Sequence, residues 1–300
     1  MMIKMIGRLW PFPKDRNEAM ASWQPYHAWR RGGFNTATGN IQVREKVWSP
    51  QLANYRNLYV YLPSSYEMAD RRYPVLYMHD GQNLFDQSTS FAEEWKVDET
   101  MERLSREGIE AIVVGIPNRG VQRLAEYSPF RDIHHGSGRG DHYLAFIEET
   151  VKPLVDKDFR TLRGREHTGI MGSSMGGLIS LYAFFSRPHL FGFAGVMSPS
   201  FWYADRAIFP FVRRAPFVPG RLYLDVGTRE YGGSMTEKEA RARSRRHYGQ
   251  VRRMKRILVQ KGYRPHSDLL VIEEKWAAHH EPAWARRLPD ALRFLLAPLF

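Results

Sequence analysis

The stretch HTGIMGSSMGG, residues 167–177, constrains the fold of this 300-residue chain more than any other segment. An apolar run enters it and a helix-forming run follows it, which predicts a strand, a tight turn and a helix in succession. Gly172 and Gly176 flank the turn, where larger side chains would be crowded. Ser174 would then stand clear of the sheet at a helix start, where free N–H groups stabilise negative charge. The G-x-S-x-G pattern makes Ser174 a candidate nucleophile; the rival interpretation is an incidental serine in a glycine-rich turn.

Predicted strands and helices alternate along the chain, which indicates the α/β class. Apart from the strand that enters the serine turn, we expect strands at residues 40–49, 56–62, 73–79, 110–116, 192–198, 221–227 and 268–274. The runs at residues 73–79 and 110–116 are short and continuously apolar, as in strands buried on both faces of a parallel sheet. The pattern predicts a mostly parallel sheet of about eight strands with helices on both faces. No linker or repeat divides it, so we expect one domain over residues 36–300, without a large lid, after an N-terminal extension over residues 1–35.

Composition excludes some classes of function. The chain has no cysteine, which excludes disulfides and thiolate chemistry, and its formal charge is +12. Much of the excess lies in residues 238–261, whose sparse apolar positions predict a surface helix with a solvated basic face. That segment carries no nucleic-acid fold signature, so no nucleic-acid partner is predicted. No run approaches the ~20 apolar residues of a membrane span, and no leader-like run precedes Pro11, so we expect a cytoplasmic location.

An acid and a histidine follow the serine turn at strand ends, where a parallel sheet gathers reactive groups. Asp225 lies within one late strand and Glu230 in the loop after it. His279 and His280 follow the next strand. The order serine, acid, histidine is the order that a Ser–acid–His triad needs on a doubly wound sheet. Either carboxylate and either histidine fits this order.

The chain resembles the putative-esterase family of α/β-hydrolases, which includes siderophore, feruloyl and acetylxylan esterases, S-formylglutathione hydrolase and the mycolyltransferases. The segments that carry the resemblance are HDGQNLFD (79–86), RLAEYSP (123–129), FRTLRGREHTGIMGSSMGGL (159–178), MSPSFWY (197–203), DVGTRE (225–230) and HHEPAWARRLPDALRFLL (279–296). They occur in family order over about residues 40–297. The resemblance implies the α/β-hydrolase fold.

The resemblance also implies roles for particular residues. Glu230 matches the family position of the triad acid better than Asp225 does, and His279 fits the H-x-E-x-x-W frame. The backbone N–H groups of Gln82 and Met175 would form the oxyanion hole.

We expect the substrate pocket to include Arg123, Phe201 and Trp202. For Arg123 a structural ion pair and loop anchor near the rim is the preferred interpretation, with substrate contact second. Pocket lining and core packing are equally consistent with the two aromatic residues. Asp80 and Asp86 are interpreted as turn-capping residues. No His/Asp spacing indicates a metal site, so neither a metal nor another cofactor is predicted.

The function implied is that of a serine carboxylic ester hydrolase with a Ser–Glu–His triad and an acyl-enzyme intermediate. The expected substrates are small-molecule or carbohydrate-linked esters, with short acyl groups or of the siderophore type. The alternative is an acyltransferase with the same triad, because only the acceptor differs once the acyl-enzyme has formed.

Overall fold

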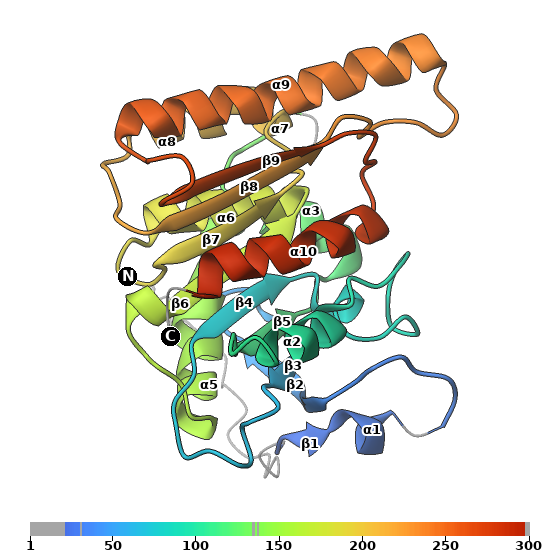
Figure 1. Cartoon of the computed structure of the whole chain (residues 1–300), viewed down its shortest axis with the longest axis vertical. Helices are drawn as coiled ribbons and strands as arrows, with labels where there is room; N and C mark the ends of the chain where they lie inside the picture. Colours follow the sequence, from blue (N-terminus) through green and yellow to red (C-terminus); the bar gives the residue numbers. More distant parts are fainter. Residues whose placement is uncertain (1–21, 31, 134–135, 137, 298–300) are drawn as a thin grey trace, which may run out of the picture.

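The structure is a computed structural model that describes residues 22–30, 32–133, 136 and 138–297. In these residues one sheet has the strand order β1-β2-β3-β5-β4-β6-β7-β8-β9 (Figure 1). The strands are β1 (Gln24–Pro25), β2 (Asn40–Ser49), β3 (Asn54–Leu62), β4 (Val75–His79), β5 (Ile112–Ile116), β6 (Thr168–Ser173), β7 (Phe193–Met197), β8 (Arg221–Gly227) and β9 (Leu269–Glu274). Pairing is antiparallel from β1 to β5 and parallel from β5 through β4 to β9.

This architecture confirms the predicted α/β fold, with one correction to the strand number. The ninth strand, β1, lies inside the predicted extension and pairs with β2. Two residues are too few to produce an alternating pattern, so the sequence did not reveal it. Tyr26 follows β1 and is buried, and its hydroxyl donates a hydrogen bond to Asp86 Oδ2 at 2.6 Å. Residues 22–30 of the predicted extension are therefore attached to the sheet, and residues 1–21 lie outside the described residues.

Helices cover both faces of the sheet (Figure 1). One apolar core holds side chains of α2 and α10 against the sheet, and the other holds side chains of α4, α5, α6, α8 and α9. The helices are α1 (Tyr26–Trp29), α2 (Val97–Ser105), α3 (Arg123–Glu126), α4 (Gly140–Phe146), α5 (Lys152–Asp158), α6 (Met175–Ser186), α7 (Tyr203–Arg206), α8 (Ile208–Arg214), α9 (Glu237–Lys261) and α10 (Glu281–Leu296). Shorter turns are η1 (Gly81–Asn83), η2 (Gly120–Gln122), the π-helical η3 (Ile147–Val151) and η4 (Arg165–His167).

The long basic helix α9 lies along the β9 edge of the molecule (Figure 1). It begins with a capping box, in which Thr236 Oγ1 accepts from the N–H of Glu239 and the Glu239 carboxylate accepts from the N–H of Thr236. It ends at Gly262, whose φ of 113° suits glycine in a left-handed cap. Most of its arginines are exposed, as the solvated-face interpretation predicts.

The strand order creates a crevice between β4 and β6. The connection from β4 leads through α2 to β5 on one side, whereas the connection from β6 leads through α6 to β7 on the other. Ligands of doubly wound sheets bind at such a divergence, beyond the carboxyl ends of the strands. Among the described residues no helix is long and apolar enough to cross a membrane.

Candidate active site

Ser174 occupies the turn between β6 and α6 in a strained backbone conformation, with φ 58° and ψ −119°. Its N–H donates to Met197 O at 2.9 Å, which ties the turn to the end of β7. A side chain at position 172 is excluded, because a Cβ there would lie 2.7 Å from Cδ2 of His79. The positive φ and the crowding explain why the turn projects the serine outward.

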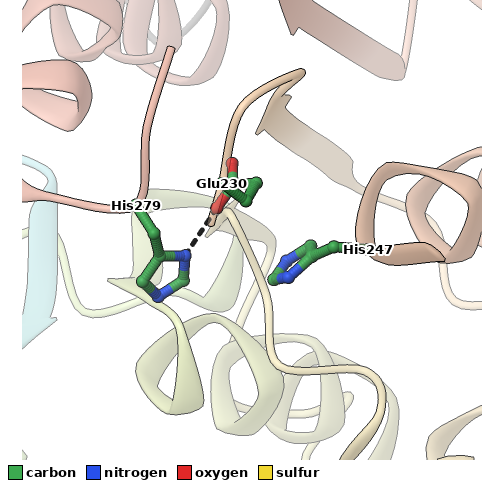
Figure 2. Close-up of side chains that lie close together, drawn as sticks. All are labelled: Glu230, His247 and His279. Atoms are coloured by element: carbon green, nitrogen blue, oxygen red, sulfur yellow. Dashed lines mark hydrogen bonds and ion pairs between the residues drawn. The ribbon is translucent and has the colours of Figure 1, made fainter. Parts of the chain in front are cut away.

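Glu230 and His279 form a close pair at the ends of β8 and β9. Glu230 Oε2 lies 2.5 Å from His279 Nδ1 (Figure 2). The other carboxylate oxygen accepts from Ser198 Oγ at 2.8 Å and from the N–H of Gly227. Burial opposes ionisation of Glu230, but the hydrogen bond and charge of His279 outweigh it and hold its pKa below the ordinary value. The carboxylate is thus fixed in its charged form against the imidazole.

Ser174 and His279 line one cavity of about 590 Å³. Because Nδ1 of His279 is hydrogen-bonded to Glu230, only Nε2 remains available to accept a proton from a serine hydroxyl. In this structure Ser174 Oγ lies 3.1 Å from Ser200 Oγ. Bonds of a catalytic serine are often looser without substrate, so this contact is compatible with a role for His279 as its base. The cavity is lined by Asp80, Asn83, Phe91, Trp95, Asn118, Gly120, Val121, Arg123, Ser173, Ser174, His279, Glu281 and Trp284.

The two predicted oxyanion donors lie at helix starts. Met175 is the first residue of α6, and Gln82 lies in the single turn η1 after β4. First-turn N–H groups have no acceptor within their own helix, so both are available to a ligand. Gly81 lets this turn lie against β5, because a Cβ there would be 2.5 Å from backbone atoms of Gly115 and Ile116.

The rival acid and histidine lie elsewhere. Asp225 is fully buried and accepts from Arg287 Nε at 2.8 Å, and neither histidine is among its hydrogen-bond partners in the described residues. His280 Nδ1 accepts from the N–H of Ala283 at 3.3 Å and so caps α10. Of the alternatives in the sequence, the structure brings Glu230 and His279 together.

The structure places two of the predicted pocket residues outside the lining of this cavity. Phe201 is fully buried in the core and packs on Phe209, with 5.8 Å between ring centroids. Trp202 is partly exposed but lies outside the residues that line the cavity. The chain after β7 turns back toward β6, where the N–H of Ser200 donates to Ser174 O, so this loop lies against the serine turn although neither ring lines the cavity.

Arg123 does line the cavity, and its guanidinium forms a bidentate ion pair with Asp80, at 2.7 and 2.8 Å. Asp80 precedes η1 but makes no side-chain cap hydrogen bond to it, so the capping interpretation of Asp80 is wrong. Asp86, by contrast, accepts from the N–H of Ser88 at 2.8 Å and does cap its turn.

Sequence reasoning missed His247 and Arg287. His247 is buried on the apolar stripe of α9, and its ring centroid lies 5.6 Å from that of His279. Burial lowers the pKa of His247 to about 4, so it is neutral at pH 7. Arg287 lies on the apolar stripe of α10 and donates to Asp225 and Ser198. A histidine or arginine at a stripe position of an amphipathic helix was the available signal.

Comparison with known proteins identifies the family of this chain and several relatives. Residues 49–295 match the family model described as Putative esterase. The chain is 28% identical over 258 residues to the uncharacterised protein YbbA of Bacillus subtilis, covering 82% of this chain and 95% of YbbA. It is 38% identical over 114 residues to a siderophore enterobactin esterase of Emericella nidulans, covering 34% of this chain and 35% of that protein. The fold resembles an IroE-like serine hydrolase from Shewanella oneidensis, with TM-score 0.67, 20% identity and coverage of 87% and 81%.

The fold and these relatives define an ester-hydrolysing enzyme of the α/β-hydrolase class. The chain belongs to the Putative esterase family, whose model spans most of its length. The acyltransferase alternative finds no support among the relatives.

Proposed function

We propose that this esterase is a serine enzyme in which Ser174 is the nucleophile, His279 its general base and Glu230 the residue that orients the base. The observation that carries the proposal is the Glu230–His279 bond beside a cavity that Ser174 also lines. Glu230 fixes the imidazole as the tautomer with a proton on Nδ1, which leaves the Nε2 lone pair to accept the serine proton.

The reaction follows from these positions. Ser174 Oγ bonds to the ester carbonyl carbon while its proton moves to His279 Nε2. The N–H groups of Gln82 and Met175 would stabilise the oxyanion, and the imidazolium returns the proton to the departing alcohol as the C–O bond breaks. Water then attacks the acyl-enzyme by the same proton path and releases the acid.

We propose aryl esters with short acyl groups as substrates, and the side chains of the cavity wall support the aryl part of this proposal. Trp284 packs edge-on against His279 at 5.1 Å, and Trp95 lies 5.5 Å from Trp284, so two indole rings stand beside the reacting atoms. Phe91 adds an exposed ring. Arg123 places a guanidinium on the same wall, which suits phenolic or anionic groups. Siderophore-type and carbohydrate-linked aromatic esters combine these features, and esterases of that kind occur among the relatives.

Replacement of the nucleophile tests the proposal. Ser174→Ala should lower kcat for 4-nitrophenyl butyrate by at least about 10⁴-fold and abolish covalent labelling by a fluorophosphonate. Ser173→Ala is the matched control, because Ser173 lines the same cavity at the end of β6 and should retain both properties. Turnover and labelling that survive in Ser174→Ala would exclude this mechanism. A kcat/KM that rises steadily to dodecanoyl esters would exclude the short acyl pocket.

A further inference from the structure

A third side chain faces the Glu230–His279 pair. His247 projects from α9 toward the pair (Figure 2), and its residue is 2% exposed. Its Nδ1 lies 3.4 Å from the hydroxyl of Tyr231, whereas its Nε2 is buried without a hydrogen-bond partner among the described residues. A buried imidazole nitrogen without a partner is costly. The ester-cleavage mechanism assigns no role to this side chain.

The three side chains offer the donor set of a transition-metal site. One ring nitrogen from each histidine and one oxygen of Glu230 lie within 4.8 Å of one another. Tetrahedral zinc, with bonds near 2.1 Å, places its ligands about 3.4 Å apart. The donors must therefore approach by at most about 1.4 Å, which side-chain rotation can supply. Two imidazoles and one carboxylate are a set that binds Zn²⁺ and leaves a fourth position open.

A dissolved ion can reach these donors. His279 lines the cavity of about 590 Å³ and its side chain is 28% exposed, although Glu230 and His247 are buried behind it. The ion would enter beside Ser174 and meet the imidazole of His279 first.

We propose that Glu230, His247 and His279 bind Zn²⁺ or a similar transition-metal ion, and that this binding switches the esterase off. The bound ion takes the Glu230 carboxylate away from His279 and occupies a lone pair of its imidazole. The serine proton then has no acceptor. The inhibitory effect rests on the proposed role of His279, whereas the binding of the ion does not. The site differs from the sequence expectation, which included no metal.

Zinc binding is tested apart from catalysis. Calorimetric titration of ZnCl₂ into Ser174→Ala should show one ion per chain. The double variant Ser174→Ala/His247→Phe should bind at least about tenfold more weakly, because one of three protein ligands is gone. Equal binding by the two proteins would overturn the proposed site, whatever the outcome for esterase activity.

Inhibition is tested on chelator-treated protein, with each variant normalised to its own metal-free rate. The zinc concentration for half inhibition should rise at least about tenfold in His247→Phe, and His247→Gln provides the same comparison if the first variant fails to fold. The control is His189→Ala, which removes an exposed histidine 2.6 Å from Glu148 and should leave zinc inhibition unchanged. Mg²⁺ should not inhibit, because it prefers oxygen ligands. Activation by zinc, or the same inhibition in His247→Phe as in the unmodified chain, would overturn the proposal. Absence of turnover before metal is added would instead contradict the proposed function.

Discussion

Two aspartate–arginine pairs flank the site, one open to the cavity and one buried in the protein. Asp80, which follows β4, and Arg123, the first residue of α3, both line the cavity, and the Arg123 side chain is 27% exposed. Asp225 on β8 and Arg287 on α10 have side chains that are 0% and 5% exposed, and both residues lie outside those that line the cavity. The Asp80–Arg123 pair can therefore contact a substrate. The Asp225–Arg287 pair cannot, and it can affect the reaction only by positioning other residues.

The buried Asp225–Arg287 pair, called the sealed pair below, is connected to the proposed triad through Ser198. Arg287 Nη2 donates to Ser198 Oγ at 3.1 Å, and Ser198 Oγ donates to Glu230 Oε1 at 2.8 Å. Arg287 also binds Glu274 at 2.7 Å, so one guanidinium joins α10 to the ends of β8 and β9. One aspartate–arginine pair thus forms part of the cavity wall, whereas the other supports the position of Glu230 and His279.

The largest expected effect is a difference in kcat between variants of the two carboxylates in and after β8. Glu230→Gln should lower kcat on the order of 10³–10⁴-fold with little change in KM, because the imidazole loses its tautomer control. Asp225→Asn should lose less than tenfold in kcat at a temperature where it is folded, because its carboxylate contacts Arg287 rather than His279. Steady-state kinetics of both variants check this, and equal losses would reject Glu230 as the acid.

The next effect concerns the stability that the sealed pair supports. Arg287→Met should lower the free energy of unfolding by about 3–5 kcal/mol, because it leaves the buried Asp225 without its counter-charge. Arg293→Met is the control on the same helix, since its pair with Glu107 is about 40% exposed on both sides. The control should lose less than about 1 kcal/mol. Urea unfolding measures both, and similar losses would show that the sealed pair does not hold this region together.

The sequence predicted the features that depend on local patterns, but not the contacts between residues that are distant along the chain. Strand periodicity and the glycine-flanked serine predicted the sheet and the elbow, because both signals are local. The Arg287–Asp225 contact joins residues 62 positions apart, and no local pattern encodes such a pairing. His247 belonged to a helix whose charge dominated its interpretation. Phe201 and Trp202 follow a strand end as pocket residues do, but the direction of the turn after β7 is set by tertiary packing.

A smaller effect, on substrate preference, is expected from the Asp80–Arg123 pair on the cavity side. Arg123→Met should lower kcat/KM for a carboxylate-bearing aryl ester by about tenfold, because it leaves the Asp80 carboxylate on the cavity wall without its counter-charge. The neutral butyryl ester should lose less than about threefold. Arg119→Met matches the change in net charge and lies outside the residues that line this cavity. If both variants lost the same activity toward the anionic ester, long-range steering rather than contact with Arg123 would be responsible.

The smallest expected effect is in the pH dependence of stability. As pH falls, the contributions of Asp80 and Asp225 to the free energy of unfolding should change in opposite directions. Burial opposes ionisation of Asp80, but Arg123 and Asn118 outweigh it and hold its pKa below 3.8. Burial raises the pKa of Asp225 above 3.8, and the attraction of Arg287 offsets only part of that rise. A lowered carboxyl pKa adds stability at neutral pH that is lost as pH falls below the ordinary value, and a raised one does the reverse.

The stability advantage of the unmodified chain over Asp80→Asn should therefore shrink as pH falls from 7 to 3, whereas its advantage over Asp225→Asn should grow. Each unit of difference between folded and unfolded pKa contributes about 1.4 kcal/mol, so the divergence should be measurable by urea unfolding across this range. Two curves of the same slope would show that the sealed and open carboxylates have the same electrostatic environment, and would remove the distinction between the two sides of the site.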